Sequence, residues 1–340
     1  MEAFRVDPLD DELLAEWSNV LRASDEDLWP GQTGFTLPDI RAFARHRGTY
    51  HRFELVAAGD QDGTVLGVGL MELPQRDNLH SVELTVAVHP AHRRRGAGSA
   101  VVTLLGELAA ADGRRSMNAI VDVPVARASD HASRYFAPKV GFEARLPGNR
   151  RHLAVPVDAV RLDALRGVVA GARDAGSYRT FAFVTPWPEE FVEDHCELNR
   201  RMSTDEPAGD GEKEEEVWDA ARLREYDDLL VAREGWKLCA VAQHIPSGHL
   251  VAFSELQLAH DTPSEAWQMA TLVHPEHRGH RLGLAVKIAN LDFLGEQAPE
   301  VRLIVTGNAG TNAPMIAVND MLGFEVAGVG MFWQKHLAAA

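Results

Sequence analysis

The residues with the clearest chemical potential lie in one arginine- and glycine-rich stretch, VHPAHRRRGAGSAV, at 88–101. Gly96 and Gly98 stand between an apolar alternating segment and an apolar run of helical character. The first N–H groups of a helix have no intrahelical partner, and glycine lets a ligand approach them closely. A phosphate satisfies these groups and the positive end of the helix dipole, and arginine adds charge. The spacing therefore indicates a site for a phosphate-bearing ligand at a strand–helix turn.

Other phosphate and polyanion sites fit this stretch poorly. A dinucleotide fingerprint needs a third glycine and a later acidic residue, and a Walker A loop needs Gly-Lys-Ser/Thr. Neither pattern is present. The chain has 340 residues and a net charge of −16, so its surface repels polyphosphates. We therefore expect neither nucleic acid nor a membrane as a partner.

The stretch has a second copy in the chain. VHPAHR at 88–93 returns as VHPEHR at 273–278, which is 185 residues later (from Pro90 to Pro275). KVGFEA at 139–144 has a counterpart in MLGFEV at 321–326. Two landmarks in the same order and at similar spacing indicate a duplicated domain.

The elements that must position these turns follow the same order in both halves. Apolar periodicity and turn residues predict a leading helix, three strands, a helix after the turn, a further strand and a short helix. In the first half these are 10–23, 52–58, 64–73, 81–88, 98–111, 116–123 and 133–142. In the second half a strand at 178–184 precedes helices near 188–201 and 217–234. Then come 237–243, 248–257, 267–273, 283–296, 301–306, 313–322 and a closing strand at 332–337.

The strand, the turn Arg93-x-x-Gly96-x-Gly98 and the GF dipeptide at 141–142 resemble the GNAT (Gcn5-related N-acetyltransferase) superfamily. The second half resembles it too, through TLVHPEHRGHRLGLAVK at 271–287 and NAPMIAVNDMLGF at 312–324. The resemblance implies an α/β fold of two tandem GNAT domains, each a mixed, largely antiparallel sheet flanked by helices, in a mycothiol-synthase-like layout. We expect an N-terminal domain at 1–157, a linker or interdomain helix at 158–176 and a C-terminal domain at 177–340.

The resemblance also implies acetyl-CoA as co-substrate and direct acetyl transfer to a small-molecule primary amine in a ternary complex. It implies that strand and turn residues of the first half bind the cofactor, namely Val86, Val88, Arg93, Arg94, Arg95, Gly96, Ala97, Gly98 and Ser99. In the second half it carries the same role to Leu272, Val273, Arg278, Gly279, His280, Arg281, Leu282, Gly283, Asn308 and Asn312.

Two differences between the halves favour the first as the catalytic one. When the halves are aligned on Pro90 and Pro275, Gly96 corresponds to Arg281, whose side chain would crowd a pyrophosphate or fold outward. In the same alignment Glu83, the residue expected to deprotonate the amine, corresponds to Gln268, which cannot accept that proton. The alternatives are catalysis by the C-terminal half, and a CoA-binding pseudo-acetyltransferase that serves as sensor or scaffold. Glu83 could also be an ordinary outward-facing strand carboxylate.

Other candidate residues have simpler interpretations. Tyr135 could protonate the leaving thiolate, although packing between helix and sheet would explain it equally. The histidines at 89, 92, 274, 277 and 280 are not accompanied by acidic or cysteine ligands, so no metal is expected. Cys196 beside His195 indicates a structural cysteine in a helix, because adjacent helical residues point in different directions. Two cysteines without a CxxC pair, and an acidic N-terminus that lacks the basic start and apolar run of a signal peptide, favour a cytoplasmic protein. We expect a monomer or homodimer.

Overall fold

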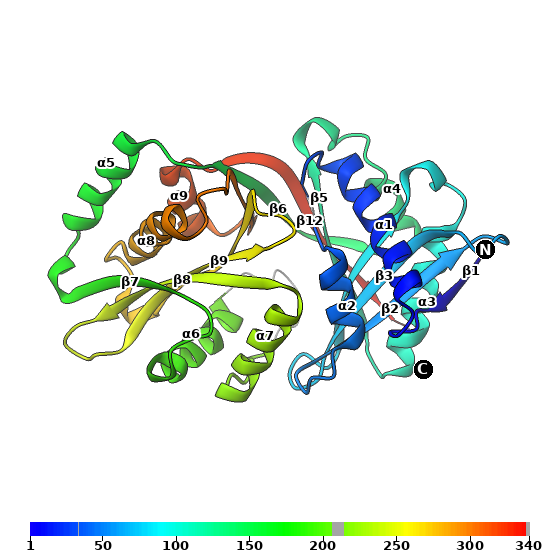
Figure 1. Ribbon diagram of the computed structural model, residues 1–340, viewed down its shortest axis with the longest axis horizontal. Helices are drawn as coiled ribbons and strands as arrows, with labels where there is room; N and C mark the ends of the chain where they lie inside the picture. The colour runs from blue at the N-terminus through cyan, green and yellow to red at the C-terminus, as the bar shows by residue number, and fades with distance from the viewer. Residues whose placement is uncertain (33, 206–213, 338–340) are drawn as a thin grey trace. The chain divides into compact units, whose positions relative to one another are not determined.

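The computed structural model describes residues 1–32, 34–205 and 214–337, and it confirms the α/β fold class (Figure 1). The described chain forms two compact units. The first contains Met1–Gly148 together with the chain from Gly328 onward, and the second contains the described residues between Asn149 and Ala327. The closing strand of the sequence is therefore part of the first unit.

The first unit is a sheet with the strand order β1-β2-β3-β4-β5-β12. All neighbouring strands are antiparallel except β4 and β5, which are parallel. The strands are β1 (Glu2–Arg5), β2 (His51–Gly59), β3 (Val65–Pro74), β4 (Ser81–Val88), β5 (Ser116–Pro124) and β12 (Glu325–His336). The helices are α1 (Asp11–Leu28), α2 (Leu37–Arg45), α3 (Ala97–Ala111) and α4 (Ser133–Lys139).

The second unit repeats this plan with the strand order β6-β11-β10-β9-β8-β7, and β10 and β11 form its parallel pair. Its strands are β6 (Glu143–Ala154), β7 (Tyr178–Val184), β8 (Gly235–His244), β9 (Leu250–Ala259), β10 (Glu265–Val273) and β11 (Leu303–Ala309). Its helices are α5 (Ala159–Ala170), α6 (Val192–Asp205), α7 (Ala220–Ala232), α8 (Leu282–Gln297) and α9 (Ala313–Leu322).

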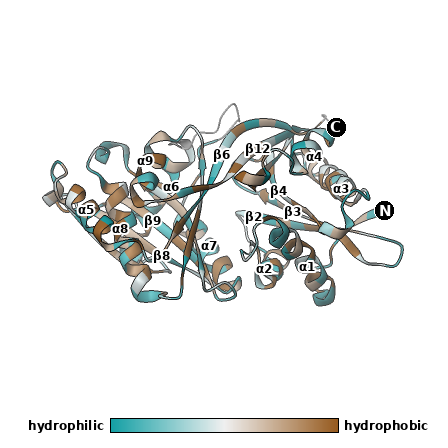
Figure 2. Ribbon diagram, turned by 90° about the horizontal axis from the view of Figure 1, so that it is seen from above, coloured by the Kyte–Doolittle hydropathy of each residue, from teal (hydrophilic) through white to brown (hydrophobic). Residues whose placement is uncertain are grey.

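Each core lies between the sheet and the helix that follows the arginine-rich turn. In the first unit Val101 and Leu105 of α3 pack on Met71, Val82 and Met117, all fully buried. In the second unit Leu284 and Ile288 of α8 pack in the same way on the sheet. Figure 2 shows brown and teal alternating along α1, as expected for a helix with one apolar face. The turns thus lead directly into helices that pack into the two cores.

Four elements were not predicted from the sequence: β1, α2, β6 and, as a definite helix, α5. For α2 a signal was available, because Thr36 and Asp39 form a capping box and Pro38 occupies the first turn. The 158–176 segment holds α5, which packs Leu165 into the apolar core of the second unit. No helix in the described part of the chain is long and apolar enough to cross a membrane.

Candidate functional site

In each unit the two parallel strands pair at one end and then separate. Strand β4 pairs with β5 only from Ser81 to Glu83, and both strands continue beyond that point without pairing to each other. Strand β10 pairs with β11 only from Glu265 to Trp267 and then also diverges from it. Both openings lie directly before the turn that leads into α3 or α8. A ligand can therefore reach strand backbone and helix N-terminus together.

Backbone N–H groups line both openings. His89 N donates to Leu66 O at 3.0 Å, so the alternation of an antiparallel pair turns the N–H groups of Val86 and Val88 away from β3 and toward β5. In the second unit His274 N donates to Val251 O at 2.8 Å. The same alternation directs the backbone N–H groups of Thr271 and Val273 toward β11, and the N–H group of Leu272 toward β9. Thr271 is thus a lining residue that the sequence analysis did not include.

The two turns share one backbone conformation although their residue types are exchanged. In the first turn Arg94 and Gly96 adopt left-handed φ values of 67° and 96°. In the second turn the equivalent positions are Gly279 and Arg281, with φ values of 84° and 60°. Each turn therefore has one glycine and one strained arginine at its left-handed positions. The arginine at 281 does not alter the path of the backbone.

The three arginines of the first turn lie in different surroundings. Arg93 Nη1 donates to Asp27 Oδ2 of α1 at 2.7 Å, and this hydrogen bond is the main reason why the pKa of Asp27 is lowered. Arg94 and Arg95 are exposed, while Ala97 and Gly98 are buried and Ser99 is half-buried. Arg93 therefore fastens the turn to α1, and the other two can supply charge to a phosphate.

The second turn is fastened differently. His280, the counterpart of Arg95, is buried and donates from Nδ1 to Arg173 O at 2.8 Å. His277 Nδ1 lies 3.1 Å from the hydroxyl of Tyr178. Burial, and then the nearby His244, lower the pKa of His277. The described residues include no group of three or more His, Cys, Asp or Glu suited to a metal ion.

The space in front of the two helices also differs. A Cβ on Gly98 would lie 3.0 Å from Phe136 Cζ and 3.2 Å from Val88 Cγ2, so α4 packs tightly over the start of α3. A Cβ on Gly283 would have its nearest neighbour, Val273 Cγ2, at 3.6 Å. Tyr135, the suggested acid, is 62 % exposed, whereas the adjacent Phe136 carries the packing. The suggested acid role of Tyr135 therefore stays a prediction, and Phe136 is the residue of this pair that packs on the core.

Glu83 lies at the last β4–β5 pair, where the opening begins. Its side chain is exposed, and its Oε1 accepts a hydrogen bond from Asn118 Nδ2 at 2.9 Å. The β3–β4 register is regular, so Glu83 and Thr85 lie on the face opposite α3, while Leu84 and Val86 face it. A carboxylate at this position can accept a proton from a group bound beside the opening.

The counterpart of Glu83 in the second unit is not the residue that the linear comparison indicated. Strand β10 has a register shift between Gln268 and Thr271, where it inserts one extra residue. Both Glu83 and Trp267 close their parallel pair, so Trp267 is the equivalent residue. Gln268 is buried and donates to Glu255 O at 2.8 Å. The comparison of Glu83 with Gln268 is therefore displaced by one position.

The remaining second-unit candidates have structural contacts. Asn308 Oδ1 accepts from Asn319 Nδ2 at 2.8 Å, which ties β11 to α9. Asn312 caps α9 by accepting from Met315 N at 3.3 Å. Leu282 is buried under the sheet, and Arg278 is exposed and donates from Nε to Val273 O at 3.3 Å.

A buried ionic cluster in the second unit was not found from the sequence. Lys237 Nζ donates to Glu255 Oε2 at 3.1 Å, beneath His195 stacked on Trp187 with ring centroids 3.6 Å apart. Burial lowers the pKa of His195 to about 3. Cys196 is buried and unpaired, and burial raises the pKa of its thiol to about 11, so it is a structural cysteine as predicted.

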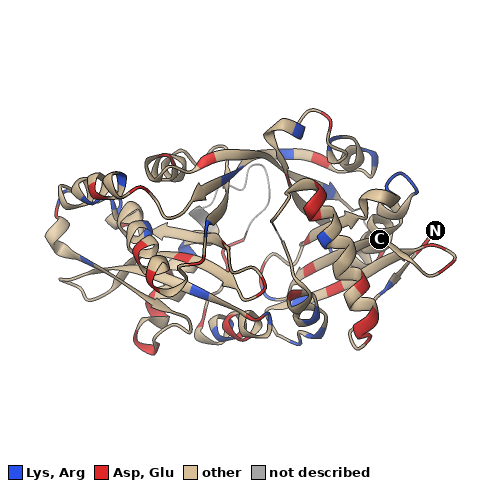
Figure 3. Cartoon of the chain, turned by 45° about the horizontal axis from the view of Figure 1, so that its top comes forward, with Lys and Arg blue, Asp and Glu red and all other residues tan. Residues whose placement is uncertain are grey.

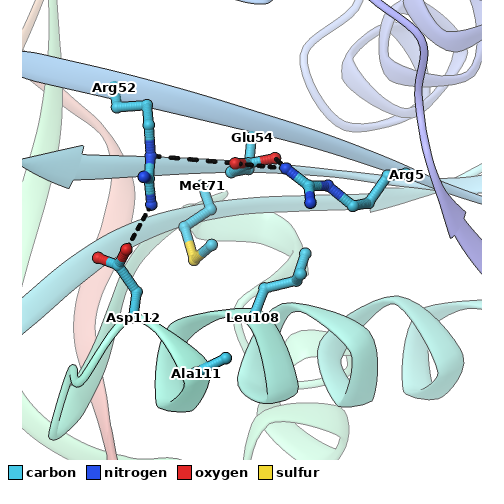
Figure 4. Close-up of a pocket in the computed structure, with 7 residues that line it drawn as sticks. All are labelled: Arg5, Arg52, Glu54, Met71, Leu108, Ala111 and Asp112. Atoms are coloured by element: carbon cyan, nitrogen blue, oxygen red, sulfur yellow. Dashed lines mark hydrogen bonds and ion pairs between the residues drawn. The ribbon is translucent and has the colours of Figure 1, made fainter.

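A surface pocket of the first unit lies away from the turn, around the C-terminal end of α3 (Figure 4). Its charged groups bind one another: Arg5 Nη2 donates to Glu54 Oε1 at 2.7 Å, and Arg52 Nη2 to Asp112 Oδ1 at 2.7 Å. Figure 3 shows acidic and basic residues interspersed over both units. Neither feature competes with the opening as a ligand site.

Comparison with known proteins agrees with this geometry. Residues 14–142 match the acetyltransferase (GNAT) family. The chain is similar to a tandem GNAT protein from the clavulanic acid biosynthesis pathway, solved without AcCoA, with 26% identity, a TM-score of 0.79 and coverage of 100% of this chain and 99% of that chain. A GCN5-related N-acetyltransferase from Sphaerobacter thermophilus has the same fold, with 14% identity, a TM-score of 0.63 and coverage of 98% and 95%. No curated protein sequence matches the chain.

Proposed function

We propose that this chain, which is similar to a tandem GNAT protein, is an N-acetyltransferase that moves the acetyl group of acetyl-CoA to a small-molecule primary amine, with its first unit as the catalytic one. The observation that carries the proposal is Glu83, a carboxylate at the point where β4 and β5 separate. The register-equivalent residue of the second unit, Trp267, cannot take up a proton.

The residues of the first unit have distinct roles in this reaction. The N-terminus of α3 with Arg94 and Arg95 binds the pyrophosphate, and Gly96 keeps the approach open. The N–H groups of Val86 and Val88 orient the thioester arm and stabilise negative charge on its carbonyl oxygen. Glu83 accepts the proton of the attacking ammonium group, which is protonated at neutral pH. Acetyl-CoA supplies an activated acyl group whose thiol is a good leaving group, so no acid is essential.

Glu83→Gln tests the proposal. We expect kcat for acetyl transfer to fall about 10²- to 10⁴-fold, because the proton acceptor is lost, while the Kd for acetyl-CoA stays within about twofold. Glu54→Gln is the matched control, since Glu54 lies on the other face of the sheet and binds Arg5. Steady-state kinetics over a panel of amines, with calorimetry for acetyl-CoA, measure both quantities. Full activity of Glu83→Gln would exclude Glu83 as the base.

Catalysis by the second unit is the alternative that a specific observation favours. Strand β10 has an extra residue between Gln268 and Thr271, and a Cβ on Gly283 would meet Val273 Cγ2 at an ordinary contact distance of 3.6 Å. Gly96→Arg distinguishes the two: loss of both acetyl-CoA binding and turnover assigns them to the first unit, whereas retained turnover assigns it to the second. A wild type that binds acetyl-CoA but acetylates no amine supports the sensor or scaffold role.

The expected setting of the enzyme follows from composition. The acidic net charge and the two free cysteines support a cytoplasmic enzyme without nucleic acid or membrane partners. We propose that it acts as a monomer or homodimer.

A further inference from the structure

A chain of two buried amides stands behind Glu83. Asn118 of β5 donates from Nδ2 to Glu83 Oε1 at 2.9 Å, and its Oδ1 accepts from Gln334 Nε2 of β12 at 3.2 Å. Asn118 is 7 % exposed and Gln334 is 9 % exposed. The carboxylate that meets the opening is therefore held by groups that water hardly reaches.

The strand registers make this contact unavoidable. Glu83 pairs with Asn118 across the parallel strands, and Asn118 pairs with Gln334 across the antiparallel strands. The three side chains form one row on the face of the sheet opposite α3. Glu72 continues the row on β3, where it binds His51 Nδ1 at 2.6 Å. Among the other charged residues of that face, Asp122 and His336 lie in different rows.

Hydrogen-bond polarity gives each amide a single orientation. An ionised carboxylate only accepts, so Asn118 must turn its NH₂ group toward Glu83 and its oxygen toward β12. Gln334 must then present its own NH₂ group to that oxygen. The row is consequently ordered from Gln334 through Asn118 to Glu83, and each donor reinforces the next.

The described residues of the second unit form no such row. The register equivalents of Glu83 and Asn118 are Trp267 and Val305, which offer neither a carboxylate nor an amide. The row is therefore not a general requirement of this sheet, since the second sheet forms without it.

We propose that Asn118 and Gln334 are positioning residues that hold the Glu83 carboxylate ionised and aimed at the β4–β5 opening. This inference rests on the proposed function, in which Glu83 is the proton acceptor. It makes β12, the last strand of the sequence, a contributor to the first unit's site through one side chain. Hydrogen bonds to the ionised form favour that form, so their removal moves the titration of the carboxyl to higher pH.

Two variants test the row. Asn118→Leu removes the donor to Glu83, and we expect the acidic limb of the kcat profile to move up by about one pH unit with at least a tenfold loss of kcat at neutral pH. Gln334→Met removes only the outer donor and keeps the volume, so we expect the same changes at smaller size. Met331→Leu is the control, because Met331 lies on β12 but faces the α3 core. The KM for acetyl-CoA should stay within about twofold in all of them.

A direct titration makes the test independent of turnover. Carbon-13 NMR of the glutamate carboxyl groups, with Glu83→Gln assigning the signal, gives the midpoint for Glu83 in each protein. A higher midpoint in Asn118→Leu and Gln334→Met, but not in Met331→Leu, supports the row. Unchanged midpoints in both variants would overturn it, even if their thermal stability falls. Inactivity of the wild type, or full activity of Glu83→Gln, would refute the proposed function, while the titration still decides whether the row controls Glu83.

Discussion

At the residue scale, Arg281 shows how one position can tolerate two residue types. It adopts φ 60° and ψ 18° at the N-cap of α8, the conformation that Gly96 adopts at the N-cap of α3. A non-glycine residue there carries a cost of about 1 kcal/mol relative to glycine. No heavy atom lies within 4 Å of a Cβ built on Gly96, so a side chain meets no protein neighbour there. The difference between the turns thus concerns the ligand more than the fold.

Exchange of the two residues should change stability in opposite directions. We expect Arg281→Gly to raise the free energy of unfolding by about 1 kcal/mol and Gly96→Arg to lower it by a similar amount, because each acts on a left-handed residue. Urea unfolding followed by tryptophan fluorescence measures both. Gly279→Ala is a second strained substitution for comparison, since Gly279 has φ 84°. An unfolding of the whole protein by Gly96→Arg would contradict this assignment.

At the element scale, α3 and α8 occupy the same place but have different interiors. Val102 of α3 packs in the apolar core, and the equivalent residue of α8 is Lys287, which is 2 % exposed. Its ammonium lies 5.5 Å from the ring centroid of Phe324. Burial lowers the pKa of Lys287 to about 7. The second unit therefore carries a charged group whose removal should stabilise it.

Lys287→Met should be more stable than the wild type, and the gain should depend on pH. The folded pKa of about 7 lies below the unfolded value, so well below pH 7 the lysine is charged in both states and the burial cost is complete. As pH rises from 7 toward 10, the folded state releases the proton and the cost shrinks. We expect a gain of about 2–4 kcal/mol at pH 7 that declines by pH 9.5.

Urea unfolding at a series of pH values measures this gain. The control is Lys139→Met, because Lys139 is an exposed residue of α4. A gain that is constant with pH would show that packing, and not the buried charge, limits the stability of α8.

At the scale of the whole molecule, the first unit depends on the end of the chain. Strand β12 pairs with β5 from Gly328 to His336, and its Trp333 is buried in the core beneath α3. A segment that ends at Val157 would expose the edge of β5 and lose this tryptophan. Exposed edges favour aggregation, and deletion of a core tryptophan alone costs about 3–5 kcal/mol.

The fragment 1–157 should therefore be unstable or aggregated, whereas the same fragment joined by a flexible linker to a copy of 328–337 should fold. Size-exclusion chromatography and urea unfolding compare the two. The matched control carries the ten strand residues in scrambled order, which keeps composition and removes the register. Equal unfolding midpoints for the bare and the extended fragments would show that 1–157 is complete without β12.

Much of the local organisation could be read from the sequence. The repeated VHP-x-HR and GF landmarks revealed the duplication, and periodicity located the strands and helices around each turn, because these patterns depend on residues close in sequence. The glycines of the arginine-rich turn predict a close approach of a ligand to a helix N-terminus, and this stays a prediction; the left-handed φ of Gly96 is a further reason for glycine there. Helix α2 was not predicted, although Thr36 and Asp39 form a capping box, because its nine residues give only a short apolar pattern.

What the sequence determined by itself is the tandem α/β plan, the strand–turn–helix sites and the chemical types available there. Tertiary structure alone decided which of those residues meet. One extra residue in β10 makes Trp267, and not Gln268, the equivalent of Glu83. Asp27 of α1 accepts a hydrogen bond from Arg93, and β12 places Gln334 beside Asn118. The physical reason is that local patterns fix the face of a residue only relative to its own strand. Register and partner strands are set by long-range pairing, and one inserted residue changes them without a visible signal in the pattern.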